Sequence, residues 1–146
     1  MINFSSKNNQ RPVHDLVAGF EDGTLPREEW THAAHLTVAL WYLVHYPADE
    51  AVRRIRDGIK HYNVAVGVVS TPTSGYHETL TLFYIRAMKR FVETATSGLP
   101  TESLVETMLE SDIAKREYPL RFYTKELLFS PEARAMWAEP DICALD

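Results

Sequence analysis

The segment from Trp30 to Leu36 reads WTHAAHL and places His32 and His35 three residues apart in an otherwise apolar stretch. Residues three apart on a helix share one face, so both imidazoles can point into the same space. An apolar core gains nothing from groups that titrate near neutral pH unless something uses their nitrogens. The histidine pair therefore marks a candidate site.

A second block, GYHETLT, adds His77 and Glu78. Neutral imidazoles and a carboxylate in a dry cavity suit zinc, or else iron, manganese or nickel, with a vacant position for water. His77 is expected in the first turn of a helix, where the positive helix end keeps the ring neutral and free to act as a ligand. We predict a divalent metal, most simply zinc, bound by His32, His35 and His77.

Two residues of the second block are candidates for catalysis. Glu78 would be the general base or a fourth ligand, and Tyr76 would act beside it; with Thr79 and Thr81, Tyr76 would also donate hydrogen bonds to the ligands. Metal-bound water has a depressed pKa, so hydrolase or lyase chemistry on a small-molecule substrate would be accessible near pH 7.

Three other interpretations stay open. The same cavity could bind a small ligand without metal, the histidines could be satisfied core residues, or exposed aromatic residues near the C-terminus could mediate self-association as a homodimer. Thr81 stands where an HExxH motif needs its second histidine, so a zincin motif is absent. Glu29 and His32 form a single ExxH element, so a two-metal carboxylate site is not expected.

The remaining histidines carry less weight. His14 and His45 are isolated, and we expect each on a helix surface or in packing. For His61, a position on the surface and a position in the histidine site are equally expected.

Hydrophobic periodicity, together with glycine and proline breaks, predicts an all-α, single-domain bundle of about five to six helices with a wrapped C-terminal segment. We take residues 1–146 as one domain and expect residues 1–11 to be flexible. Residues 66–75 are predicted as a loop, with a short strand as the alternative. Serine or threonine at 73–74 is expected to cap the helix that follows. The helices are predicted over residues 12–22, 24–46, 47–66, 75–96, 101–110 and 131–137.

The order of the helices predicts where the site lies. Short connections make consecutive helices antiparallel, so the helices over 24–46 and 75–96 run parallel and their N-terminal halves meet at one end of the bundle. The C-terminal end of the helix over 47–66, with His61 and Asn63, should reach the same end. These elements would deliver polar groups to one buried region.

Composition narrows the class of protein. The chain has 146 residues, 45% of them apolar and 24% charged, with a net charge of -5. This charge is opposite to what phosphate-backbone binding requires, so nucleic acid is not an expected partner. Cys143 is the only cysteine, which excludes an intrachain disulfide and fits a reducing cytoplasm. No apolar segment suits export or a membrane span, so we expect a cytoplasmic protein.

The two blocks, W-T-H-x-x-H-L and G-Y-H-E-T-x-T, together with the tail LLFSPEARAMWAEPD, resemble those of a group of small uncharacterised bacterial helical proteins. The resemblance covers most of the chain from Phe20 onward. It implies no known activity and only marks the residues of the two blocks as hallmark positions. A looser resemblance to metal-binding helical bundles of the DinB type concerns the fold alone, because the histidine spacing differs.

Overall fold

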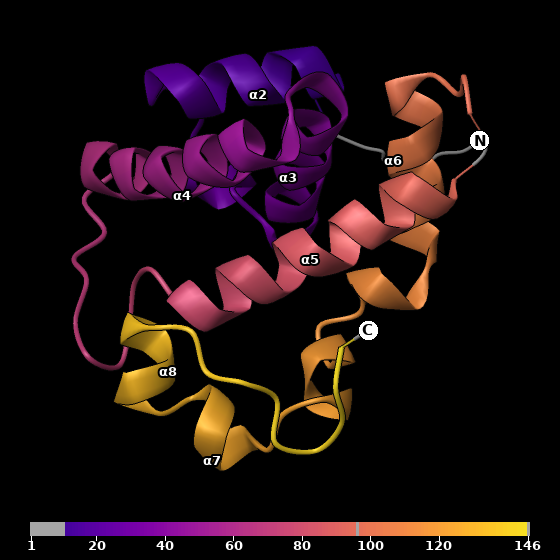
Figure 1. The fold of residues 1–146 in the computed structure, drawn as a ribbon. Helices are drawn as coiled ribbons and strands as arrows, with labels where there is room; N and C mark the ends of the chain where they lie inside the picture. Colours follow the sequence, from indigo (N-terminus) through magenta and orange to yellow (C-terminus); the bar gives the residue numbers. More distant parts are fainter. Residues whose placement is uncertain (1–10, 96, 146) are drawn as a thin grey trace.

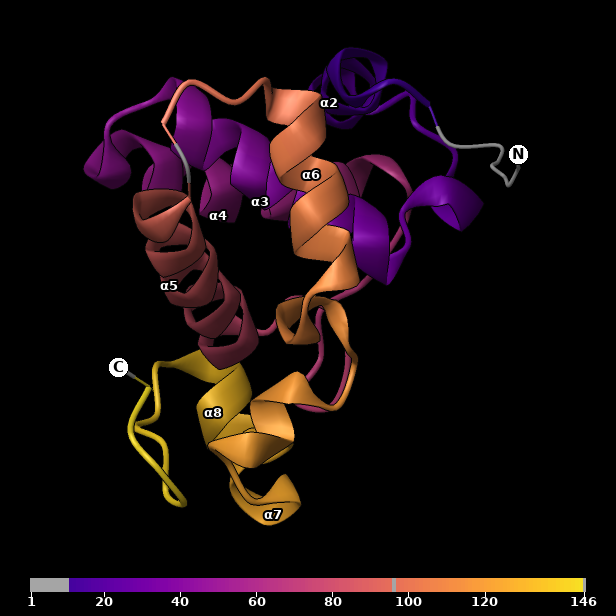
Figure 2. The ribbon, with the colours of Figure 1, turned by 90° about the vertical axis from the view of Figure 1, so that its right-hand side faces the viewer.

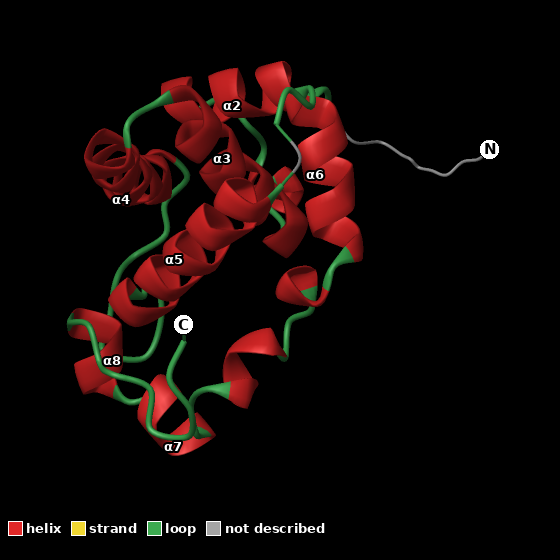
Figure 3. Cartoon of the chain, turned by 45° about the vertical axis from the view of Figure 1, so that its right-hand side comes forward, coloured by secondary structure: helices red, strands yellow, loops and turns green. Residues whose placement is uncertain are grey.

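The computed structural model describes residues 11–95 and 97–145, and every regular element in this part of the chain is helical (Figures 1 and 3). The predicted all-α class is confirmed. The prediction for residues 1–11 concerns a segment that, apart from Arg11, lies outside the described residues. The α-helices of the described residues are α2 (Val13–Asp22), α3 (His32–His45), α4 (Ala48–Ala65), α5 (Glu78–Thr94), α6 (Thr101–Glu110), α7 (Lys125–Leu128) and α8 (Pro131–Ala135).

Helix α3 is the centre of the fold, and α2, α4, α5 and α6 all contact it. Its sequence is apolar on nearly all faces, and residues that point in different directions, such as Leu36, Val38 and Leu40, are all buried. Phe20 of α2 stacks on Trp30, two residues before α3, at a ring-centroid distance of 4.8 Å. Because α3 is held on several sides, the side chains of its first turns have defined positions.

The C-terminal segment lies against the N-terminal half of α5, as the predicted wrapped segment requires (Figure 2). Two 3₁₀ turns, Asp112–Ala114 and Tyr118–Arg121, lead into α7 and α8. The buried Thr79 hydroxyl donates to the Met136 carbonyl at 3.0 Å and accepts the Ala138 N–H at 3.0 Å. These bonds tie the last residues of the chain to α5.

The predicted starts of two helices were wrong. Residues 24–30 form a turn that includes a 3₁₀ segment, Arg27–Glu29, and α3 begins only at His32. Thr31 is its N-cap and accepts the Ala34 N–H at 3.1 Å. Helix α5 begins at Glu78 rather than Gly75, and its N-cap is His77, whose imidazole takes the place of the expected serine or threonine oxygen.

Residues 66–77 form the predicted loop and contain no strand, only an isolated bridge between Thr71 and Ser74. Gly75 has a φ of +88°, and a Cβ at this position would lie 2.8 Å from the Cα of Ser70. Only glycine fits this close backbone approach. The loop is therefore folded back on itself where it enters α5.

Among the described residues, none of the helices has both the length and the apolar character that a membrane crossing requires.

Candidate functional site

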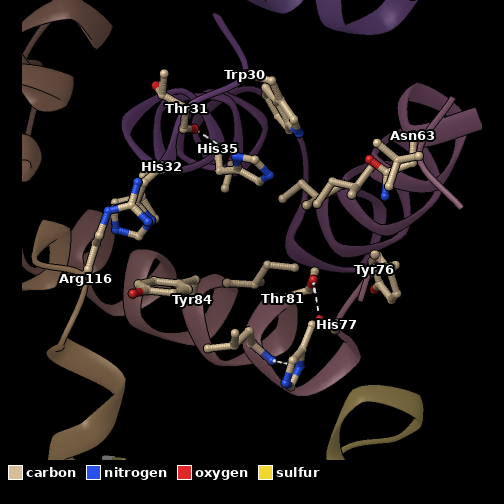
Figure 4. Close-up of a pocket in the computed structure, with 18 residues that line it drawn as sticks. Trp30, Thr31, His32, His35, Asn63, Tyr76, His77, Thr81, Tyr84 and Arg116 are labelled. Atoms are coloured by element: carbon tan, nitrogen blue, oxygen red, sulfur yellow. Dashed lines mark hydrogen bonds between the residues drawn. The ribbon is translucent and has the colours of Figure 1, made fainter. Parts of the chain in front are cut away.

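A cavity of about 450 Å³ lies between α3, α4 and α5 (Figure 4). The N-terminal halves of α3 and α5 and the C-terminal half of α4 line it, as the helix order predicts. Its volume falls within the range of small-molecule sites. Its walls are mostly apolar and include Leu36, Ala39, Ile55, Ile59, Val68, Leu80 and Ile85.

His35 has one ring nitrogen directed into the cavity. Its Nδ1–H donates to the Thr31 carbonyl at 2.8 Å, which fixes the tautomer and leaves a lone pair on Nε2. Figure 4 shows Nε2 facing the cavity. The ring lies against the indole of Trp30, with centroids 3.9 Å apart. Burial lowers the pKa of His35 to about 4, so the imidazole is neutral at pH 7.

His32 lies beside His35 and has a similar arrangement. Its Nε2 is 3.1 Å from the Ala114 carbonyl, so this nitrogen must carry the proton and donate, and Nδ1 keeps a lone pair. Burial and the nearby charge of Arg116 both lower the pKa of His32. The structure therefore brings together two neutral imidazoles, each with one lone pair that no described residue uses.

Other polar groups around the cavity lack partners among the described residues. The indole N–H of Trp30 is buried without an acceptor. Figure 4 shows this nitrogen at the end of the indole ring nearest the cavity. The Tyr84 hydroxyl, the Asn63 amide and the exposed guanidinium of Arg116 also line the cavity and make no hydrogen bond or ion pair within the described part of the chain. Unpaired donors and acceptors at an apolar cavity are expected to be met by solvent or a ligand.

His77 does not join the other two histidines as a ligand. Its Nε2–H donates to the Leu128 carbonyl at 2.7 Å, and its Nδ1 accepts the Leu80 N–H at 3.1 Å. Both ring nitrogens are therefore used inside the protein, and no lone pair is left for a metal. The imidazole caps α5 and holds it to the C-terminal segment, although one face of the residue lines the cavity.

Glu78 and Tyr76 do not form a base directed at the cavity. Arg56 holds the Glu78 carboxylate through two hydrogen bonds, of 2.9 and 3.2 Å, and the Tyr76 hydroxyl donates to it at 2.6 Å. Burial raises the pKa of Glu78, but the bonds from Tyr76 and Arg56 and the charge of Lys60 outweigh it, so the pKa is lowered overall. The Glu78 carboxylate is therefore occupied by its ion pair with Arg56 and its hydrogen bond from Tyr76.

The other residues assigned to the site also have structural roles. Thr79 is fully buried in its bonds to the C-terminal segment, and Thr81 donates to the His77 carbonyl at 2.7 Å. His61 is exposed and lies outside the cavity, whereas Asn63, two residues on, lines it. None of these side chains meets the His32 and His35 lone pairs as a metal ligand.

Within residues 11–95 and 97–145, no three or more histidine, cysteine, aspartate or glutamate side chains are grouped closely enough to hold a metal ion. The predicted set of His32, His35 and His77 is therefore not assembled. Two residues important to the cavity were not assigned to it from the sequence. These residues are Trp30 and Arg116, and neither residue type nor spacing points to their meeting at His32 and His35.

Comparison of the chain with protein-family models, with curated proteins and with solved structures found no match. The resemblance suggested by the two sequence blocks stays a prediction.

Proposed function

We propose that this protein binds a small, planar organic molecule in the cavity between α3, α4 and α5, without a metal. The observation that carries the proposal is the Nε2 lone pair of His35, which faces an apolar cavity of about 450 Å³ while Nδ1 is committed to the Thr31 carbonyl. A buried acceptor without a donor is costly, so a ligand that donates a hydrogen bond there gains affinity and specificity.

The walls indicate the shape and chemistry of this ligand. Aromatic rings of Trp30, Tyr76 and Tyr84 line the cavity together with aliphatic side chains, and a planar ring can stack or pack against such surfaces. The neutral His35 and His32 nitrogens accept hydrogen bonds, which favours a ligand with a hydroxyl or N–H group. A phenol-like ring satisfies both requirements.

Arg116 adds a preference for negative charge. Its guanidinium lines the cavity beside His32 and has no carboxylate partner among the described residues. The planar guanidinium group forms strong, bidentate, charge-assisted hydrogen bonds with a carboxylate. We therefore expect an aromatic hydroxy acid to bind better than an uncharged ring of the same size.

The electrostatics of His35 favour binding over acid–base catalysis. A general base works best when its pKa lies near the working pH, whereas the pKa of His35 is about 4. Such a ring accepts a hydrogen bond at pH 7 but takes up a proton only with difficulty. Its close contact with the Trp30 ring and its hydrogen bond to the Thr31 carbonyl also hold it in one orientation, as a binding site requires.

Metal-dependent chemistry is a second candidate, and one observation favours it. Backbone carbonyls fix the tautomers of both His32 and His35, which is how metal-binding imidazoles are commonly oriented. The two lone pairs would then supply two ligands, and substrate or water would complete the coordination. Stoichiometric metal in untagged wild-type protein, lost in His35→Phe, would support this candidate over the metal-free one.

A calorimetric titration with three probes tests the preferred proposal. We expect 4-hydroxybenzoate to bind at least about fivefold tighter than benzoate, which lacks the donor, and tighter than 4-hydroxybenzamide, which lacks the charge. Ile59→Phe fills the cavity and should abolish binding. Val52→Phe places the same ring elsewhere on α4, outside the cavity, and should not. Equal binding of the three probes, or equal behaviour of the two variants, would refute the proposal.

A further inference from the structure

A second pocket, of about 440 Å³, opens on the other side of Tyr76, between α4, the loop before α5, and α8. Its charged side chains are Arg56, Lys60, Arg134 and Glu78. Three cations face one carboxylate, so the pocket carries two net positive charges in a protein whose overall net charge is -5. The binding site proposed for the first cavity does not explain this local positive charge.

Arg56 and Glu78 account for only one of the positive charges. Their ion pair is bidentate and partly buried, with 35% of the Arg56 side chain and 14% of the Glu78 side chain exposed. Tyr76 donates a further hydrogen bond to the same carboxylate. Glu78 is therefore already neutralised, and it leaves the other two cations of the pocket without a carboxylate in contact.

Lys60 and Arg134 carry this remaining charge. The Lys60 ammonium lies 4.8 Å from the centre of the Tyr76 ring and makes no ion pair among the described residues. Arg134 donates to the Gly75 carbonyl at 2.8 Å, so its guanidinium is fixed by a neutral group rather than by an acid. Its Nε–H is buried without a partner in the described part of the chain.

The pocket also offers hydroxyl donors beside the cations. Ser70 and Thr71 line it from the loop, and the Ser70 hydroxyl has no hydrogen-bond partner among the described residues. Gly75 holds the loop in place, because its backbone approaches Ser70 too closely for a side chain. A small doubly charged oxyanion could meet a fixed guanidinium, an ammonium and a hydroxyl at once, which a singly charged carboxylate would do less completely.

We propose that this pocket is a binding site for a phosphate group, either free or as a phosphate monoester, held by Lys60 and Arg134. The site is separate from the cavity lined by His32 and His35 (the histidine cavity) and does not depend on the function proposed for that cavity. Tyr76 lines both pockets, and the Gly75 carbonyl that Arg134 holds belongs to a residue of the histidine cavity.

The test is a titration of the whole protein with inorganic phosphate and with phenyl phosphate, followed by amide chemical shifts in NMR spectra at constant ionic strength. We expect saturable shifts in the Ser70–Tyr76 and α8 amides, and at least about fivefold weaker binding in Lys60→Gln. Lys60→Arg, which keeps the charge, should bind, and Lys89→Gln, a surface lysine on α5, should match wild type. Tighter binding of phenyl phosphate than of phosphate would identify a monoester as the ligand, and the reverse order would identify free phosphate.

Ile59→Phe provides the control that separates the two proposals. It should still bind phosphate even if it no longer binds 4-hydroxybenzoate. The phosphate site would be refuted by the absence of saturable shifts in folded wild-type protein. Equal affinities of Lys60→Gln and Lys89→Gln, with both folded by circular dichroism, would refute it as well.

Discussion

The ring of Trp30 lies on the imidazole of His35, with centroids 3.9 Å apart and the planes inclined by 31°. The indole shields the imidazole from solvent, and the resulting burial makes protonation of His35 unfavourable. The indole N–H of Trp30 is itself buried and has no partner in the part of the chain that the structure describes. The contact between these two residues therefore gives the cavity a buried, neutral surface with hydrogen-bonding groups that the described residues leave without partners.

Substitution of His35 by phenylalanine should change the pH dependence of stability. The folded state keeps His35 neutral down to about pH 4, whereas in the unfolded chain it titrates near 6.5. Between these values the unfolded state binds more protons, so wild-type stability should fall as pH falls and this loss should end below about pH 4. His35→Phe lacks this titration. Between pH 6.5 and pH 4 its free energy of unfolding should therefore fall by up to about 3 kcal/mol less than that of the wild type. Urea unfolding of both proteins from pH 7 to 4 measures the difference; parallel curves would contradict the low pKa.

His77→Ala should destabilise the protein, because the Leu80 N–H and the Leu128 carbonyl both lose their partner. We expect a loss of about 2 kcal/mol in the free energy of unfolding. His77→Asn can still cap α5 and should lose less. His61→Ala removes an exposed imidazole and serves as the control, expected within about 0.5 kcal/mol of wild type. A stable His77→Ala protein would contradict the structural role of this residue.

Glu78→Gln should weaken the link between α4 and α5. The change removes the ion pair with Arg56 in a partly buried place, and we expect a cost of about 1–2 kcal/mol in the free energy of unfolding. Glu50→Gln breaks a comparable bond to Arg54 on the surface of α4 and should cost less than about 0.5 kcal/mol. Chemical denaturation at pH 7 compares the two, and equal costs would show that the Glu78 pair contributes no more than a surface pair.

Gly75→Ala should be more destabilising than Gly67→Ala. Both glycines have positive φ, so both variants lose about 1 kcal/mol to backbone strain. Of these two, only at Gly75 would the added Cβ meet backbone, 2.8 Å from the Cα of Ser70, whereas no atom of the described residues lies within 4 Å of a Cβ at Gly67. Thermal unfolding of the pair isolates the steric contribution. Equal melting temperatures would mean that the loop can move away from Gly75 at little cost.

Much of the fold could be predicted because its signals are local. The limits of α4 and α6 follow from proline at the start and from amphipathic periodicity, and the structure agrees with them to within one residue. The start of α5 could not be read in this way, since its N-cap is an imidazole rather than a serine or threonine oxygen. Helix α7 was missed because four residues are too few for periodicity to be visible.

The candidate site was predictable only in part, for a related reason. The pairing of His32 and His35 depends on spacing along one helix, which the sequence contains. The structural role of His77 depends on its hydrogen bond to the Leu128 carbonyl, 51 residues away along the chain. No local sequence pattern predicts that bond. The approach of Arg116 to His32 likewise arises from the irregular segment after α6.

The central claim is that the Nε2 lone pair of His35 receives a hydrogen bond from a bound ligand, and ¹⁵N NMR of the imidazole rings tests it most directly. At pH 7 the free protein should show an unprotonated Nε2 on His35, and saturation with 4-hydroxybenzoate should shift this resonance toward the value of a hydrogen-bonded nitrogen, while both His77 nitrogens stay unchanged. A protonated His35 at pH 7, or an Nε2 resonance that does not move at saturation, would contradict the account.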